Sequence, residues 1–231
     1  MENKKDILLF LDLEGTLLSE KTGKFEQDDM LSLLGEIDKL EEITKAKVHI
    51  GILSPVFKKD SEKIIDDIDR MIARYNIRNH SHLNEIEFAG ADFSDELKGQ
   101  EELYDKVFPL PKPIDRRETD YSSYGKYACA KRWVEMFQEK GSLCMAIYGG
   151  NGQNDIRAMR YIRNLSNGFV MCPSNSRTEI KENIAHFVSD KTDIHGMVEN
   201  FQALNNEIEK RKPEHPGKSE QTIKETLRDE R

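Results

Sequence analysis

ILLFLDLEGTL, residues 7–17, is the stretch that decides the fold. Its first part, 7–11, is entirely apolar, as in a strand that is buried on both faces of a parallel sheet. Two acids follow directly, Asp12 and Glu14, and after them comes the turn residue Gly15. Because unpaired charges are costly in a protein core, the stretch predicts a chemical site at the end of a strand, with Asp12 as a nucleophile.

The rest of the chain alternates short apolar runs with longer amphipathic ones, which is typical of β-α-β units around a parallel sheet. Further strands are expected at 48–53, 85–89, 143–148, 169–171 and 187–189. Helices are expected at 27–45, 61–75, 124–140, 177–185 and 195–207, with one more through Ile156, Met159 and Ile162. The sequence therefore predicts an α/β fold, a three-layer Rossmann-like parallel sheet with helices on both faces.

The length of 231 residues suits one domain with a sizeable core, which we assign to residues 1–208. Within this domain, residues 92–121 do not follow the alternating pattern of strands and helices, because 108–113 is rich in proline and 115–120 is highly charged. We expect an irregular surface excursion or a minimal cap there. Residues 209–231 are almost wholly charged or polar and are expected to form a disordered tail or a linker.

The composition argues against several classes of protein. Acids outnumber bases by 43 to 35, which gives a formal net charge of -8 and no basic stripe of the kind that binds nucleic acid. No apolar run approaches the roughly 20 residues of a membrane span, and the amino-terminal residues lack the apolar core of a signal peptide. We therefore expect a soluble, cytoplasmic protein with no nucleic-acid partner and no membrane span.

The cysteines are too far apart for a C-x-x-C motif, so they indicate neither a disulfide framework nor a zinc site, and they fit a reducing compartment: Cys129, Cys144 and Cys172. The segment from Cys172 to Arg177 resembles the phosphate loop of cysteine-dependent phosphatases, but it has one residue fewer between the thiol and the arginine than that loop requires. We interpret Cys172 as a buried residue at the end of a strand.

Four segments are expected to meet at one edge of the sheet. In an open parallel sheet, ligands bind beyond the carboxyl ends of the strands, which is where Asp12, Glu14, Ser54 and the 151–155 loop fall. Phosphoryl transfer to a carboxylate needs a nucleophile, a cation, donors to the phosphate oxygens and an acid for the leaving group. These segments can supply all four, so the sequence predicts a phosphatase in which Asp12 forms an aspartyl-phosphate and Glu14 is the general acid and base.

Mg²⁺ is the expected cofactor, because it prefers hard oxygen ligands in octahedral geometry. Asp12, the backbone carbonyl of Glu14 and a residue of the 151–155 loop can provide such ligands. The hydroxyl of Ser54 and a lysine are expected to hold the phosphate.

These motifs resemble the haloacid dehalogenase (HAD) superfamily of aspartate-dependent phosphatases. The family's Asp-x-Asp-Gly-Thr-Leu motif is similar to residues 12–17, and its serine or threonine after the second strand matches Ser54. Its lysine ahead of the last motif matches Lys126, and the last motif, Gly-Asp-Gly-x-Asn-Asp, is similar to residues 150–155. The stretch 169–198 is similar to the end of the Cof-like subgroup.

The resemblance covers about residues 6–204 and implies a HAD-like fold with roles for individual residues. It implies that the phosphate is bound by Gly15, Ser54 and Lys126. It implies that the metal ligands are Asp12, Glu14, Asn151 and Asp155.

Two positions depart from the family's pattern. Glu14 stands where the family has an aspartate and is one methylene longer, so the acid is kept while its reach changes. Asn151 stands where the family has a metal-binding aspartate; its amide oxygen can still coordinate Mg²⁺, but the lost charge should weaken binding and leave more of it to Asp155. Because Asp12 is kept, we expect an active enzyme.

Each segment also has a plainer interpretation. Asp12 and Glu14 could form a turn or cap a helix, and Lys126 could be a solvated helix residue. Residues 149–155 could be a simple Gly-Asn turn. The hypothesis of a phosphatase rests on the order of these segments along one chain.

The substrate is expected to be bulky, because the sequence leaves little room for a cap domain over the site. A turn, one helix and a strand take up the interval between Asp12 and Ser54, and 92–121 is short for a folded domain. An open site suits a phosphoprotein, for example one that carries phosphotyrosine. Two alternatives stay open: a small-metabolite (sugar or nucleotide) phosphatase whose lid comes from a partner, and a binding or regulatory module with a weak site.

Overall fold

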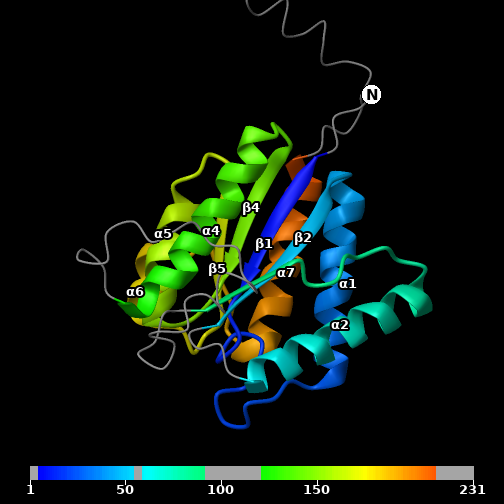
Figure 1. Cartoon of the computed structure of the whole chain (residues 1–231), viewed down its shortest axis with the longest axis horizontal. Coiled ribbons are helices and arrows are strands. Elements are labelled where there is room, and N and C mark those ends of the chain that lie inside the picture. The colour runs from blue at the N-terminus through cyan, green and yellow to red at the C-terminus, as the bar shows by residue number, and fades with distance from the viewer. Residues whose placement is uncertain (1–4, 55–58, 92–120, 212–231) are drawn as a thin grey trace, which may run out of the picture.

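A six-stranded sheet forms the centre of the computed structural model, which describes residues 5–54, 59–91 and 121–211 (Figure 1). The strands lie in the order β3-β2-β1-β4-β5-β6, and every neighbouring pair is parallel. Their bounds are β1 Asp6–Leu11, β2 Lys47–Ser54, β3 Phe88–Ala91, β4 Leu143–Gly149, β5 Gly168–Cys172 and β6 Phe187–Val188. The predicted α/β fold is thereby confirmed, and the strand order reverses between β1 and β4.

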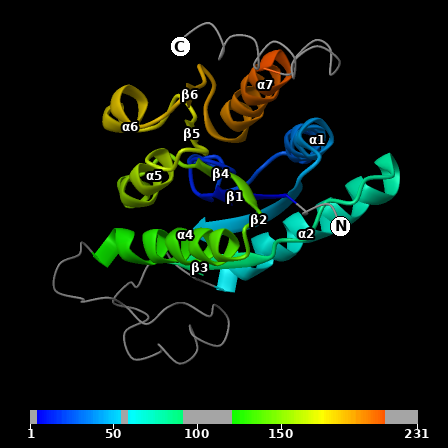
Figure 2. The same cartoon turned by 90° about the horizontal axis from the view of Figure 1, so that it is seen from above.

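The connections between the strands carry the helices, which are α1 Gln27–Thr44, α2 Lys59–Asn79, α4 Tyr121–Glu139, α5 Ile156–Arg163, α6 Thr178–Asn183 and α7 Asp193–Arg211, with the short 3-10 helix η2 Gln153–Asp155. Figure 2 shows α1 and α7 on one side of the sheet and α4 on the other. The prediction of helices on both faces is confirmed.

The two faces of β1 anchor separate parts of the core. Ile7, Leu9 and Leu11 pack with the apolar sides of α1, α2 and α7, whereas Leu8 and Phe10 pack with α4, α5 and α6. All five side chains are at most 2% exposed. Burial of each contributes about 1.5–3 kcal/mol, so β1 holds the layers together and brings the residue that follows it, Asp12, to a stable position.

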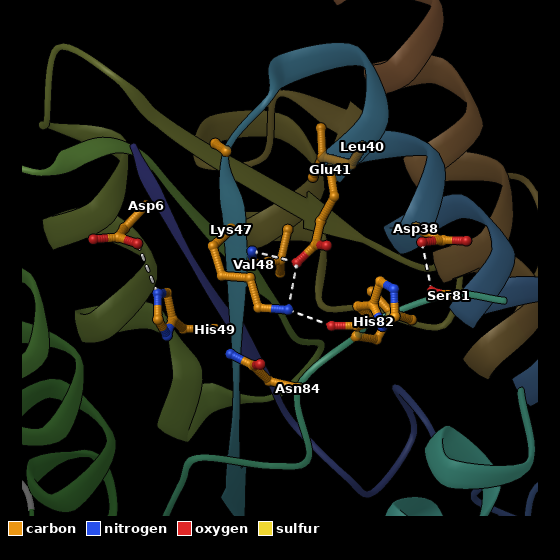
Figure 3. Close-up of polar contacts among 12 residues, drawn as sticks. Asp6, Asp38, Leu40, Glu41, Lys47, Val48, His49, Ser81, His82 and Asn84 are labelled. Carbon is orange, nitrogen blue, oxygen red and sulfur yellow. Dashed lines mark hydrogen bonds and ion pairs between the residues drawn. The ribbon is translucent and has the colours of Figure 1, made fainter. Parts of the chain in front are cut away.

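Polar side chains join the elements near the amino-terminal end of β2, far along the strand from Ser54 (Figure 3). His49 Nε2 lies 2.9 Å from Asp6 Oδ1, and His49 Nδ1 lies 2.7 Å from Glu87 Oε2. Glu41 of α1 accepts a hydrogen bond of 2.7 Å from a backbone N–H of β2. These contacts connect β2 to β1, to α1 and to the segment before β3.

The third strand begins later than predicted, at Phe88 and not at residue 85. The reason lies in α2, where Asp69 Oδ1 accepts a 2.8 Å hydrogen bond from the backbone N–H of Ile86. This bond ties Ile86 to α2, and pairing with β2 begins at the next residue, where the backbone N–H of Glu87 donates to the carbonyl of Ile50 at 2.9 Å.

Helices α2 and α7 are both longer than predicted. Helix α7 ends at Arg211, beyond the predicted domain boundary at residue 208. The added residues are mainly polar or charged and carry no apolar periodicity, so the sequence pattern does not indicate them. In the part of the chain that the structure describes, no helix is long and apolar enough to cross a membrane.

Two predictions fall outside the described residues. They are the excursion or minimal cap at 92–121, apart from the first residue of α4, and the tail from residue 212 on.

Candidate active site

Three chain segments meet where the strand order reverses. The backbone N–H of Asp12, directly after β1, donates a 2.9 Å hydrogen bond to the carbonyl of Gly149, the last residue of β4. Ser54 is the last residue of β2, which pairs with β1 on the other side. Such a switch point is where open parallel sheets bind ligands, so the predicted meeting of these strand ends is confirmed for the backbone.

A buried lysine lies between two carboxylates at this point. Lys126 Nζ, from α4, lies 2.6 Å from Asp12 Oδ1 and 2.8 Å from Asp155 Oδ1. Lys126 and Asp155 are 0% exposed and Asp12 is 3% exposed. Buried charges persist when they are paired, so the three residues depend on one another. The interpretation of Lys126 as a solvated helix residue is therefore wrong.

Asp155 is the residue that holds Lys126. Its Oδ1 also accepts a 2.8 Å hydrogen bond from the hydroxyl of Tyr148, and its Oδ2 accepts from the backbone N–H groups of Asn151 at 3.1 Å and Gly152 at 2.9 Å. An ionised carboxylate offers about four lone-pair positions, and these donors occupy them. In this arrangement the oxygens of Asp155 face Lys126, Tyr148 and the backbone, and its role as a metal ligand stays a prediction.

Tyr148 is not among the residues predicted for the site, although its position in the sequence carries one signal. It is the last residue but one of the apolar strand β4 and is 0% exposed. A buried tyrosine hydroxyl needs a hydrogen-bond partner, so a tyrosine at the carboxyl end of a central strand indicates a polar group close by.

Opposing effects act on the pKa of the Asp12 carboxyl group. Burial, and then the negative charge of Asp155, raise the pKa of Asp12 to about 7, although the neighbouring Lys126 acts to lower it. Asp12 Oδ2 accepts a 3.3 Å hydrogen bond from the hydroxyl of Thr16. Two buried carboxylates thus share one ammonium group, and a further cation beside Asp12 would favour its ionised form.

The turn after Asp12 depends on Gly15, whose φ is +71°. The backbone N–H of Gly15 donates to the carbonyl of Leu18 at 2.8 Å, and its carbonyl accepts a 3.0 Å hydrogen bond from Asn175 Nδ2. The N–H of Gly15 thus closes the turn, and its role in phosphate binding stays a prediction. A Cβ at this position would lie 2.0 Å from Asn151 Nδ2, so Gly15 allows Asn151 to approach.

Asn151 has a partner that the sequence did not indicate. Its Nδ2 donates a 3.0 Å hydrogen bond to Oε1 of the exposed Glu20. Asn151 itself is 8% exposed, and the bond orients its amide so that Oδ1 remains an acceptor. Glu20 therefore adds a carboxylate next to the position where the family resemblance implies a lost one. Only the fold of the 15–20 turn brings it there.

Glu14 and Ser54 lie at the same edge of the sheet. The side chain of Glu14 is exposed, its backbone bridges to that of Leu18, and its charge contributes to the raised pKa of Asp12. The segment does form a turn, but the carboxylate of Asp12 binds Lys126 and Thr16 and caps no helix. The side chain of Ser54 lies outside what the structure describes.

Within the described ranges, no group of three or more His, Cys, Asp or Glu side chains is arranged to hold a metal ion. Of the predicted set, Asp155 has its oxygens directed at Lys126, Tyr148 and backbone N–H groups. The hard oxygen donors that remain are the carboxylate of Asp12, the amide oxygen of Asn151, the carbonyl of Glu14 and the carboxylate of Glu20. These donor types fit Mg²⁺, which retains several waters and binds through few carboxylates.

Cys172 ends β5 and is 0% exposed, as predicted. Burial raises the pKa of its thiol, which disfavours the thiolate that a cysteine-dependent phosphatase needs. The three cysteines are free thiols.

No protein-family model matches this chain, and no curated protein matches it. Solved structures do show similarity. A cobalt-bound deoxy-D-mannose-octulosonate 8-phosphate phosphatase from Haemophilus influenzae is 14% identical with a TM-score of 0.44, over 90% of this chain and 88% of that one. A phosphatase of the HAD superfamily from Bacteroides thetaiotaomicron is 16% identical with a TM-score of 0.44, over 89% of this chain and 96% of that one.

A putative HAD superfamily (subfamily III A) hydrolase from Legionella pneumophila is 12% identical with a TM-score of 0.42, over 87% of this chain and 85% of that one. These identities and TM-scores are low. Any function proposed for the chain therefore has to rest on its own residues and contacts.

Proposed function

We propose that this protein is a phosphomonoester hydrolase in which Asp12 attacks phosphorus and forms an aspartyl-phosphate. One observation carries the proposal: Asp12 is 3% exposed at the switch point of a parallel sheet and pairs with the fully buried Lys126, which Asp155 holds from the other side. The ammonium group of Lys126 orients the carboxylate of Asp12 and favours its ionised form, and a nucleophilic carboxylate needs both.

The residues around Asp12 have separable tasks in this mechanism. Lys126 binds Oδ1 and Thr16 binds Oδ2, so the carboxylate plane is held from both oxygens. The positive charge of Lys126 favours the ionised, nucleophilic form against the effect of burial. Asp155 holds Lys126 in place, and Tyr148 holds Asp155.

Glu14 is the proposed general acid and base. An oxygen of Asp12 bonds to phosphorus, the ester P–O bond breaks, and the leaving oxygen takes a proton from Glu14. Glu14 then removes a proton from a water molecule, whose oxygen attacks the phosphorus of the aspartyl-phosphate. Inorganic phosphate leaves and the carboxylate of Asp12 is regenerated. We also propose that Ser54 contacts the phosphoryl oxygens.

Mg²⁺ is the proposed cofactor, held by Asp12, by the carbonyl of Glu14 and by Asn151. When bound, it would neutralise the charge on the phosphoryl oxygens. Glu20 orients Asn151 through the 3.0 Å hydrogen bond and supplies negative charge that the amide lacks. With this donor set we expect Mg²⁺ binding to be weaker than with an aspartate at position 151.

The favoured substrate is a bulky phosphoester such as a phosphoprotein. The described segment between β1 and β2 contains a loop and α1, with no inserted domain that could close over Asp12. A lid contributed by a second chain would instead favour a small metabolite. A panel of substrates distinguishes a bulky phosphoester from a small metabolite.

The test is release of the chromophore from a chromogenic aryl phosphate, with and without Mg²⁺. We expect release that requires Mg²⁺ and falls on the order of 10³-fold or more in Asp12→Asn, because the nucleophile is removed. Asp190→Asn is the matched control, since it makes the same substitution at an exposed aspartate that is distant in sequence from Asp12.

Release that is absent, or equal in Asp12→Asn and the control, would defeat the enzyme hypothesis and favour a binding or regulatory module. If release is seen, a panel of phosphopeptides, sugar phosphates and nucleotides identifies the substrate class. Preference for the metabolites by a monomeric protein would contradict the bulky-substrate proposal.

A further inference from the structure

A pocket of about 630 Å³ lies between the loop that follows β1 and helix α2. The size is within the range of ligand sites, which are typically about 300–1,000 Å³. Its apolar part consists of Leu18 and Phe25 from the loop and Ile64 and Met71 from the helix. Leu18 and Met71 are 4% and 7% exposed, so this part is continuous with the core of the protein.

The charged part of the same pocket is almost entirely basic. Lys24 reaches it from the loop, and Lys63, Arg70 and Arg74 reach it from α2, all of them with exposed side chains. The acid that lines it, Asp67, is 2.7 Å from Arg70 and is balanced by that ion pair. Among the residues that the structure describes, the other three cations form no ion pair, although the whole chain has a net charge of -8.

The pocket lies next to the candidate active site. Leu18, which lines the pocket, is bonded through its carbonyl to the backbone N–H of Gly15 in the turn after Asp12. Helix α2 follows β2, whose last residue, Ser54, is at the same edge of the sheet. Figure 1 shows this loop and α2 together at the carboxyl ends of the strands, and Figure 2 shows α2 extending outward from the sheet.

The spacing of the cations favours an extended ligand. Lys63 and Arg74 are eleven positions apart on one helix, which corresponds to about 16 Å at about 1.5 Å per residue. An extended peptide covers that length with about five residues. A compact phosphate ester bound at Asp12 would not need a row of positive charge of this length.

We infer that this pocket, called here the basic pocket, binds the segment that flanks the phosphorylated residue in a protein substrate. The segment carries acidic side chains, which meet Lys24, Lys63 and Arg74, and apolar ones, which pack on Leu18, Phe25 and Met71. The inference rests on the proposed phosphatase function and names the class of substrate for that same site.

The experiment compares two phosphotyrosine peptides of equal length, one with aspartate and leucine flanks and one with serine and leucine flanks. We expect kcat/KM to be about five- to tenfold higher for the acidic peptide, as a few exposed ion pairs would give. The ratio should fall towards 1 in Lys63→Gln/Arg74→Gln and as salt is raised from 0.1 M to 1 M, because screening shortens the Debye length to about 3 Å.

The control variant is Arg78→Gln/Lys210→Gln, which removes the same charge from exposed positions outside the basic pocket and should keep the preference. Binding of fluorescent versions of both peptides to the Asp12→Asn protein gives a second measurement that does not depend on turnover. There too we expect the acidic peptide to bind about five- to tenfold more tightly.

The outcomes separate the two proposals. Absence of Asp12-dependent hydrolysis of the aryl phosphate defeats the proposed function. Hydrolysis of the aryl phosphate together with equal kcat/KM for both peptides overturns the basic-pocket inference alone. A preference for the acidic peptide that survives in Lys63→Gln/Arg74→Gln overturns it as well.

Discussion

Lys126 is a cation that the protein encloses completely, and two buried carboxylates depend on it. Lys126→Met keeps most of the volume but leaves Asp12 and Asp155 without their shared partner. We expect the free energy of unfolding to fall by about 3–5 kcal/mol at neutral pH, the usual cost of an uncompensated buried charge. Chemical denaturation monitored by circular dichroism measures the change.

Lys131→Met on the same helix is the control. Lys131 is partly exposed and lies 3.7 Å from Glu135, and exposed pairs of this kind contribute only about 0–1 kcal/mol. If both variants unfolded at the same denaturant concentration, the buried position of Lys126 would be refuted.

Two glycines allow a comparison of backbone strain with steric conflict. Gly15 and Gly23 have φ values of +71° and +62°, which alanine adopts only with strain. A Cβ at Gly23 would meet nothing within 4 Å, whereas one at Gly15 would lie 2.0 Å from Asn151 Nδ2. We expect Gly23→Ala to cost about 1–2 kcal/mol of stability, and Gly15→Ala to cost more and to reduce phosphatase activity and Mg²⁺ affinity, because Asn151 has to move.

Thermal unfolding and the Mg²⁺ dependence of hydrolysis test both parts of this prediction. Equal effects of the two substitutions on Mg²⁺ affinity would show that Asn151 has no role in binding the cation. A larger effect in Gly15→Ala supports the close contact between the turn and the loop after β4.

Among the contacts between elements, His49 joins β2 to β1 and to the segment before β3 (Figure 3). Burial acts to lower its pKa, but hydrogen bonds to Glu87 and Asp6 outweigh this, so the pKa is raised above 6.5. The ring also lies 4.8 Å from that of Phe137 on α4. Only the protonated imidazole donates to both carboxylates, at 2.7 and 2.9 Å, so its charge stabilises the pairing of β1 and β2.

This predicts a specific pH dependence of stability. A raised pKa in the folded state means that the contribution is fully present below the unfolded pKa of about 6.5 and is lost as pH rises through the folded pKa. The difference in free energy of unfolding between the wild type and His49→Gln should therefore be largest below about pH 6.5 and shrink at higher pH. Urea denaturation across a pH series measures it.

The exposed His82 provides the control, because its imidazole contacts no carboxylate in the described part of the chain. His82→Gln should follow the pH dependence of the wild type. A difference between the wild type and His49→Gln that stays constant with pH would mean that the imidazole acts through packing and not through its charge.

For the whole molecule, the charge of the basic pocket is opposite in sign to the net charge of the chain. The chain has a formal net charge of -8, while four cations line the pocket beside the candidate site. An acidic substrate is repelled by the net charge of the chain and attracted by the basic pocket, so the arrangement favours selective binding over tight binding.

Most of the order of elements could be predicted from local pattern. The apolar run 7–11 predicted a buried central strand, because a strand covered on both faces has no polar side, and β1 occupies the centre of the sheet. The periodicity of α1 likewise predicted its buried residues, such as Leu33 and Ile37. The start of β3 could not be predicted, since the residue Ile86 just before it donates a hydrogen bond to Asp69, which belongs to another element.

The position of Asp12 at the end of a buried strand, and the meeting of the strand ends beside it, could be read from the sequence, because parallel strands align their carboxyl ends whatever their side chains are. The partners within the site required the tertiary structure. Asp155 pairs with Lys126 and also accepts hydrogen bonds from Tyr148 and two backbone N–H groups. Glu20 and the basic pocket likewise depend on how a turn and a helix pack, and the contacts of segments far apart in the chain leave no local pattern.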